Sequence, residues 1–301
     1  MSSRVWIDTD LGSDVDDALA LAYALRHPGL EVVGVSTVFG DVDLRSRMVV
    51  EVLKLAGTAD LPVITGLGKP LSPGRKGVMF GHEGRGLLDD PKPLARTESD
   101  PDPEATIRAL ASALEAARPD ALVAIGPLTN LGALVEAGVA LPPLSIMGGK
   151  VADVDLKRVA PSVEEWNWWS DPRAAQAVLA APHAEVPRVV PAEVTFRTAL
   201  APGDVERLAA GDVLARALAR LCEEWLTFLR DRLSVEQPQV ALHDPLTVAT
   251  LVEDSLCPFA PQRLRVDEQG ITKRESGPPN AQVAHDVRAE VLRAHLMETW
   301  L

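Results

Sequence analysis

The chain has 301 residues, of which 47% are hydrophobic and 24% charged, a composition typical of folded globular proteins and not of disordered chains. Its 43 acidic and 30 basic residues give a formal net charge of −13, which argues against DNA or RNA polymers as partners, because their affinity comes from cationic contacts to phosphates. The two cysteines provide neither a disulfide framework nor the spacing of a zinc site.

The sequence carries no pattern of a membrane or export segment. The first residues, MSSRVWIDTD, meet charge too early for the apolar region of a secretory signal. No stretch approaches the roughly 20 apolar residues of a membrane-spanning helix. We therefore expect a soluble, cytoplasmic protein with no membrane partner.

Strand and helix patterns alternate along the first half of the chain. Arg4–Asp8 and Leu30–Val38 are predicted strands, and Ala18–Leu25 between them is a predicted buried helix. These three form a β-α-β unit, whose strands pair in parallel. The alternation continues with helix Leu44–Leu55, strand Pro62–Thr65, helix Glu104–Ala117, strand Ala121–Ile125, helix Leu128–Ala137, strand Leu144–Met147 and helix Asp171–Leu179.

The second half of the chain is less regular. Ala201–Leu233 is predicted to be helical, Gln262–Val283 contains weak strand signals, and Val287–Trp300 is a predicted closing helix. Because no linker or repeat divides the chain, residues 1–301 are expected to form a single domain. Its expected fold is an open, mostly parallel α/β sheet flanked by helices.

Two long polar loops interrupt this pattern, at Arg75–Asp102 and Lys150–Ser162. Loops of this length are candidates for functional lids. Ligands of open α/β sheets bind in the crevice beyond the carboxyl ends of the strands, so functional side chains are expected just after the predicted strands.

The densest group of carboxylates follows the first predicted strand. Five acidic side chains fall within ten residues directly before an apolar helix: Asp8, Asp10, Asp14, Asp16 and Asp17. Like charges this close raise one another's pKa or need a cation between them, although a run of charge can also form a solvated loop. The place of this run at the ligand-binding edge of the sheet favours a site, and a hard cation with oxygen ligands is its natural partner.

The segment DTDLGSDVDDALAL resembles the amino-terminal signature of the inosine-uridine preferring nucleoside hydrolase family, in a variant with two extra residues before the paired aspartates. Further segments follow in the order of the family: TVFGD (37–41), GPLTN (126–130), MGG (147–149), EWN (165–167) and HDP (243–245). The resemblance implies a calcium-dependent enzyme of nucleoside salvage. Such an enzyme hydrolyses the N-glycosidic bond of ribonucleosides, releasing free base and ribose.

The resemblance also implies a metal site. Its calcium ion (Ca2+) would be held by the side chains of Asp10, Asp17 and Asp244 and by the main-chain carbonyl of Ile125. Asp10 would act in addition as the general base toward a calcium-bound water, and cleavage would pass through an oxocarbenium-like state. Asp8 is expected to support the metal ligands from behind.

The resemblance further implies where the substrate binds. Asp16, Glu165 and Asn167 match ribose contacts of the family. His243 is a candidate acid for the leaving base, although a histidine at a helix start can also be satisfied by the backbone. Trp166, beside the ribose contacts, is expected to form a wall of the pocket.

Several positions depart from the pattern of the family. Asp41 stands where an asparagine is frequent, and its carboxylate can still accept a hydrogen bond from a sugar hydroxyl. Phe80 stands where many members carry a histidine close to the base, so that Phe80 either stacks on the nucleobase or packs in the core, and His82 is a possible replacement. An asparagine that some members carry ahead of Glu165 is missing, with Val159-Ala160 near that place.

Two other classes stay open at this point. A strand ending in Asp8-Thr9-Asp10 also begins haloacid dehalogenase-like phosphatases, with Asp8 as nucleophile, but Gly12 departs from their pattern. A ribose- or calcium-binding protein that has lost catalysis on the same scaffold is the other alternative. The partner implied by the resemblance is a small nucleoside, and the family implies a homodimer or homotetramer. The preferred nucleobase does not follow from the sequence.

Overall fold

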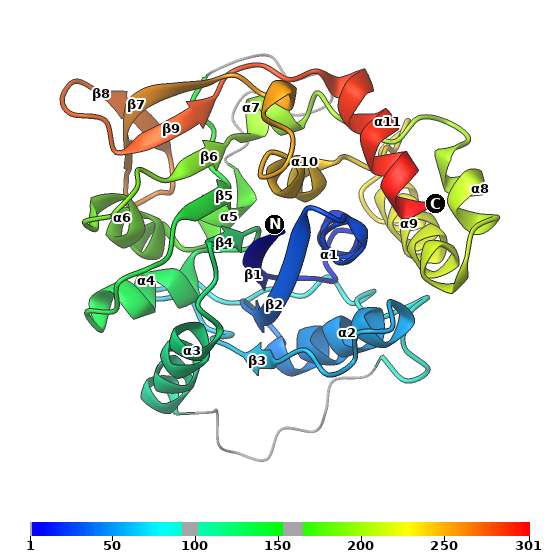
Figure 1. Ribbon diagram of the computed structural model, residues 1–301, viewed down its shortest axis with the longest axis horizontal. Coiled ribbons are helices and arrows are strands. Elements are labelled where there is room, and N and C mark those ends of the chain that lie inside the picture. The colour runs from blue at the N-terminus through cyan, green and yellow to red at the C-terminus, as the bar shows by residue number, and fades with distance from the viewer. Residues whose placement is uncertain (1, 92–101, 153–164) are drawn as a thin grey trace.

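A single sheet runs through the protein, seen in a computed structural model that describes residues 2–91, 102–152 and 165–301 (Figure 1). Within these residues the sheet has nine strands, in the order β3-β2-β1-β4-β5-β6-β9-β7-β8. The strands are β1 (Ser3–Thr9), β2 (Leu30–Thr37), β3 (Val63–Thr65), β4 (Ala121–Ala124), β5 (Leu144–Met147), β6 (Arg188–Val190), β7 (Phe259–Val266), β8 (Thr272–Glu275) and β9 (Ala281–Ala284).

Helices cover both faces of the sheet (Figure 1). They are α1 (Asp16–Arg26), α2 (Val42–Leu55), α3 (Pro103–Ala117), α4 (Thr129–Glu136), α5 (Trp166–Ser170), α6 (Pro172–Ala180), α7 (Ala192–Thr195), α8 (Asp204–Ala209), α9 (Val213–Asp231), α10 (His243–Ala249), the short 3-10 helix η1 (Asp254–Leu256) and α11 (Ala289–Trp300).

The order and direction of the strands fix where a ligand can bind. Strands β1 to β6 pair in parallel, as does β9 with β6, whereas β7 pairs antiparallel with both β9 and β8. The chain builds outward from β1 to β2 and β3 on one side, and then to β4, β5 and β6 on the other. The expected open, mostly parallel α/β sheet is confirmed. The crevice of such a sheet opens where the order reverses, here between β1 and β4.

Each face of the sheet has its own hydrophobic core. Val5 and Ile7 of β1 point to the core built with α1, α2, α9, α10 and α11, whereas Trp6 between them belongs to the core built with α3, α4 and α6. All three side chains are fully buried. A strand covered on both faces reads as a continuous apolar run, which is why the RVWI segment forms this central strand.

The structure corrects one helix expected from the sequence. Ala201–Leu233 is not continuously helical, because α8 ends at Ala209 and α9 begins only at Val213. Gly211 lies in this break, and the Asp212 side chain starts the new helix by accepting a hydrogen bond from the Ala215 N–H at 3.0 Å. A glycine followed by such a capping residue is a stop and start signal.

Parts of the two loops expected as lids lie outside the described residues, and so do Val159 and Ala160. In the portion of the chain that the structure covers, no helix is both long and apolar enough to cross a membrane.

Candidate active site

A cavity of about 270 Å³ opens at the carboxyl ends of the central strands. Asp10 reaches it from the turn after β1, Ile125 from the end of β4 and Met147 from the end of β5. Most residues expected to form the site line this cavity: Asp10, Asp16, Asp17, Phe80, Ile125, Glu165, Trp166, Asn167, His243 and Asp244.

Three carboxylates meet in the cavity, from two helices that lie far apart in the sequence. Asp16, Asp17 and Asp244 each offer one oxygen, and these oxygens lie within 4.8 Å of one another. Asp16 and Asp17 occupy the first turn of α1, and Asp244 occupies the first turn of α10. The partial positive charge at a helix N-terminus favours carboxylates there, which offsets part of their mutual repulsion.

The three carboxyl groups of this cluster are costly to ionise in the metal-free protein. The three side chains are almost fully buried, and burial raises the pKa of each well above its usual value. Repulsion by neighbouring aspartates raises these pKa values further, with Asp16 and Asp17 both acting on Asp244. An all-oxygen donor set that carries excess negative charge fits a hard divalent cation such as calcium.

Asp10 lines the cavity, and the backbone of Gly126 approaches it closely. Asp10 is 6% exposed, and burial raises the pKa of its carboxyl group while Arg45, at 3.9 Å, opposes that rise. A Cβ atom at Gly126 would lie 2.8 Å from the Asp10 nitrogen and 2.9 Å from Oδ1. The turn after β4 therefore needs a glycine at this point.

Asp8 lies behind the cavity and does not line it. The Ser36 hydroxyl donates to Asp8 Oδ1 at 2.5 Å and the Asn130 amide at 2.8 Å, and the side chain is fully buried. Burial raises the pKa of Asp8 to about 7. These contacts tie the end of β1 to β2 and α4.

Glu165 and Asn167 order the opposite wall. The Glu165 carboxylate accepts hydrogen bonds from the N–H groups of Asn167 (2.7 Å), Trp168 (2.9 Å) and Gly149 (2.7 Å), so it caps α5. Burial raises the pKa of Glu165 to about 7. The Asn167 amide donates to the Ile125 carbonyl at 3.0 Å, which fixes the direction of that carbonyl.

His243 is held through one ring nitrogen. Its Nδ1 lies 2.6 Å from the Thr195 hydroxyl, and its ring meets Phe196 edge-on at 4.5 Å between centroids. Burial lowers the pKa of His243 to about 4. Because Nδ1 is engaged, Nε2 is the nitrogen left for other partners.

Aromatic rings surround the mouth of the cavity. Phe80 and Trp166 are each 36% exposed, with ring centroids 5.7 Å apart, and Phe196 is 41% exposed. Exposed aromatic rings at the rim of an acidic cavity offer a stacking surface next to a polar floor.

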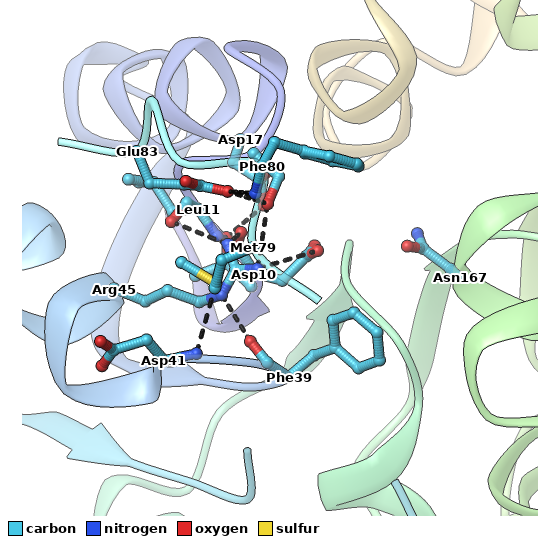
Figure 2. Close-up of polar contacts among 12 residues, drawn as sticks. Asp10, Leu11, Asp17, Phe39, Asp41, Arg45, Met79, Phe80, Glu83 and Asn167 are labelled. Atoms are coloured by element: carbon cyan, nitrogen blue, oxygen red, sulfur yellow. Dashed lines mark hydrogen bonds and ion pairs between the residues drawn. The ribbon is translucent and has the colours of Figure 1, made fainter. Parts of the chain in front are cut away.

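Two residues expected to bind substrate lie away from this cavity. The Asp41 side chain caps α2 by accepting from the Leu44 N–H at 3.0 Å, and it lines a separate cavity of about 750 Å³. In Figure 2 its carboxylate points away from Asp10 and Asn167. His82 stacks on Phe228 at 4.2 Å between centroids, and its Nε2 lies 3.0 Å from the Ser13 carbonyl. The substrate-binding roles of Asp41 and His82 stay predictions.

Several residues in or beside the cavity have no role predicted from the sequence, and Ser13, which also lines it, is one of them. Asp14 belongs to the acidic run and offers an oxygen within 4.8 Å of ligand atoms of Asp16 and His243. Phe196 and Trp225 line the cavity but stand in no motif. Arg45 is fully buried beneath it, and its place on the apolar stripe of α2, three and four residues before Met48 and Val49, was a readable signal.

Comparison with known proteins gives one consistent result. A family model described as "Inosine-uridine preferring nucleoside hydrolase" matches residues 5–294. The chain is similar to the pyrimidine-specific ribonucleoside hydrolase RihA of Salmonella typhimurium, with 30% identity over 90% of this chain and 86% of the relative. It is 28% identical to the probable uridine nucleosidase 2 of Arabidopsis thaliana, over 90% of this chain and 84% of the relative.

A solved structure supports the same result. The plant nucleoside hydrolase PpNRh1 superposes with a TM-score of 0.78 and 25% sequence identity, covering 100% of this chain and 99% of that one. The likeness therefore extends over the whole sheet and its helices, and not only over the acidic motif.

Proposed function

The chain belongs to the inosine-uridine preferring nucleoside hydrolase family, and we propose that it cleaves the N-glycosidic bond of ribonucleosides in this cavity with a calcium ion bound. The observation that carries the proposal is the meeting of Asp16, Asp17 and Asp244 within 4.8 Å in a buried cavity. Three buried carboxylates at this spacing are costly without a cation, and a cation among oxygen ligands can also bind a sugar diol.

The proposed ligands of the cation are Asp10, Asp17, Asp244 and the Ile125 carbonyl, all of which line the cavity. Calcium, when bound, would supply positive charge that makes an attacking water more acidic and binds the vicinal hydroxyls of ribose. Asp8, hydrogen-bonded below, keeps the strand end rigid and so supports Asp10.

The chain's own residues carry the proposed reaction. Asp10 accepts one proton from the attacking water, whose oxygen bonds to C1′ while the C1′–N bond breaks and its electron pair goes to the base. The base gains a proton, for which Nε2 of His243 is the proposed donor. Burial lowers the pKa of His243 to about 4, so the ring is neutral near pH 7 in the free protein and has to take up a proton before Nε2 can donate one.

In this proposal both halves of the nucleoside bind in the same cavity. Asp16, Glu165 and Asn167 are the proposed contacts of the ribose, and the carboxylates of Asp16 and Glu165 favour the positive charge that develops on the sugar. Phe80 and Trp166 at the mouth are the proposed stacking surface for the nucleobase.

The names of two relatives guide the choice of substrate. RihA is called pyrimidine-specific and the plant relative a probable uridine nucleosidase, so we propose uridine and cytidine as the first substrates to test, with inosine as the purine comparison.

The test is release of ribose and free base from these nucleosides, with and without EDTA, followed by addition of calcium chloride. We expect hydrolysis that stops on chelation and returns with calcium, and poor turnover of 2′-deoxyuridine, which lacks one hydroxyl of the diol. Binding of uridine without any release of base would contradict the proposal and favour a protein that has lost catalysis. The phosphatase alternative is set aside, because its nucleophile would be the fully buried Asp8.

The cytoplasmic location and the homodimer or homotetramer implied by the family stay predictions. Light scattering of the purified protein would measure its oligomeric state.

A further inference from the structure

A fully buried arginine lies beneath the candidate active site. Arg45 comes from the first turns of α2 and has no exposed surface, yet it does not line the cavity. Removing a guanidinium from water is costly unless its donors are satisfied by well-placed acceptors. The acceptors that Arg45 uses therefore indicate what the chain gains by burying it.

Arg45 binds the two turns that follow the two central strands. Its Nε donates to the Phe39 carbonyl at 2.5 Å, in the turn after β2. Its Nη1 donates to the carbonyl of Asp10 and, at 3.2 Å, to that of Leu11, both in the turn after β1. The planar fork of the guanidinium thus holds both turns at once (Figure 2).

Both turns are conformationally unusual, which explains why they need such support. Phe39 has φ of +66° and Gly12, just after Leu11, has φ of +126°. A non-glycine residue in the left-handed region is strained and persists where surrounding contacts hold it. Arg45 provides those contacts, and its Nη2 also lies 3.9 Å from the Asp10 carboxylate.

A chain of polar contacts extends from Arg45 to the aromatic rim. Its Nη2 donates to the Ser13 hydroxyl at 3.0 Å, and that hydroxyl donates to Glu83 at 3.4 Å. Glu83 accepts the N–H groups of Phe80 at 2.5 Å and Gly81 at 2.7 Å (Figure 2). Ser13 and Glu83 are themselves buried, so water does not compete with these contacts.

We propose that Arg45 is a positioning residue that sets the place of Asp10 and, through Ser13 and Glu83, the place of Phe80. The positions of Asp10 and Phe80 are then coupled. The buried guanidinium of Arg45 holds the turn that carries Asp10, and it is linked to the loop that carries Phe80. This inference rests on the proposed function for the roles of Asp10 and Phe80. The contacts themselves do not depend on it.

The first test replaces the fork but keeps the charge. Arg45→Lys retains a cation but cannot reach three carbonyls in two turns, and Arg47→Lys, on the same helix but directed to the Asp90 carbonyl, is the matched control. For each purified, EDTA-treated protein, circular dichroism checks folding and calorimetric titration with calcium chloride gives the dissociation constant. We expect Arg45→Lys to weaken calcium binding and to lower kcat for uridine by about 10- to 100-fold, the scale for residues that orient metal ligands. The control should match the parent.

The second test breaks the link to the rim. Ser13→Ala removes one hydroxyl, and Glu83→Gln weakens the hold on the loop of Phe80. We expect both variants to raise KM for uridine more than they lower kcat, because the stacking ring of Phe80 shifts while the general base Asp10 stays in place. In the Arg45→Lys protein, Glu83→Gln should add less than its own single effect, since the link is already disturbed.

The outcomes separate this inference from the proposed function. Calcium affinity and kcat of Arg45→Lys within twofold of the Arg47→Lys control would overturn it. If Arg45→Lys does not fold, Ser13→Ala decides, and a KM equal to that of the parent would overturn the link. Failure of the parent to cleave any nucleoside defeats the proposed function, whereas the calcium titrations would still test the role of Arg45.

Discussion

The backbone N–H of Asp244 points at the carboxylate of Asp16, with 3.4 Å between the nitrogen and Oδ2, although 228 positions separate them in the chain. This contact joins the first turns of α1 and α10. It brings the acidic run near the amino terminus and the late His-Asp-Pro segment into one cavity. The chemistry proposed for the protein depends on this junction.

The role of Asp10 as general base can be tested by an isosteric change. Asp10→Asn keeps the shape of the side chain and its place beside Gly126, but cannot accept the proton of the attacking water. We predict that kcat for uridine falls by roughly a hundredfold or more, the usual scale for loss of a general base, with folding intact. The measurement is steady-state release of ribose, with circular dichroism as the control. Turnover near the parental rate would show that another group takes the proton.

The role of His243 can be tested by varying the leaving group. His243→Ala should slow cleavage of uridine and inosine, whose bases leave as poor anions, but should affect p-nitrophenyl riboside less, because nitrophenolate leaves without a proton. The measurement is the ratio of kcat/KM between the two kinds of substrate. Thr195→Val, which removes the contact to Nδ1, should shift the ratio in the same direction. Equal losses on all substrates would argue against a donor role.

The close approach of Gly126 to Asp10 predicts an effect on activity that goes beyond stability. In Gly126→Ala the new methyl group would meet the Asp10 nitrogen and carboxylate within 3.0 Å, so Asp10 must shift. We predict a loss of kcat of roughly 10- to 100-fold, since small displacements of a reacting group have effects of this size. Gly138→Ala is the control.

Gly138 has φ of +78° and open space around it. Its replacement by alanine should therefore cost roughly 1–2 kcal/mol of stability from backbone strain while kcat stays unchanged. Thermal unfolding measures the loss of stability in both variants. If Gly126→Ala and Gly138→Ala are both less stable but both retain full kcat, then the contact between Gly126 and Asp10 does not position the general base.

The carboxylate cluster predicts how calcium stabilises the protein as pH changes. Burial and mutual repulsion raise the pKa values of Asp16, Asp17 and Asp244 in the folded state. A raised pKa stabilises the metal-free fold below the unfolded value, near 4, and this contribution is lost as pH rises through the folded value. Calcium binds the ionised form, so its stabilising effect should grow with pH.

We therefore predict that adding calcium chloride raises the Tm more at pH 8 than at pH 5, measured by calorimetry. Asp244→Asn, which removes one charge from the cluster, should reduce the difference between the two pH values. A calcium effect of equal size at both pH values in the parent would count against ionisation of this cluster on binding.

The sequence predicts the sheet well where elements are long and strongly patterned. Arg4–Asp8 and Leu30–Val38 stand out as apolar runs, and they form β1 and β2 with boundaries shifted by about one residue. The three-residue strand β6 and the four-residue helix α7 carry no period to detect. They form because neighbouring strands and the Thr195 contact to His243 hold them in place.

Most of the residues that line the cavity can be expected to meet, because they follow strand ends or occupy short motifs in a recognisable order. A charged residue in a helix pattern is usually solvated, so the place of Arg45 on the apolar stripe of α2 is a weak signal of burial, and its hydrogen bonds go to backbone carbonyls, which no residue type reveals. Asp41 and His82 lie in the expected segments, but side-chain direction depends on local caps and stacking, which put them outside the cavity.

The most direct measurement is a calorimetric titration of the EDTA-treated protein with calcium chloride, performed in parallel on the parent and on Asp244→Asn. We predict that the parent binds one ion per chain. In the variant, binding should weaken by at least roughly tenfold, because the substitution removes the charge of Asp244, a proposed ligand that lies 228 positions from Asp16 in the chain. Equal affinity in both proteins, or a parent that binds no calcium, would contradict the convergence of these segments on a single cation.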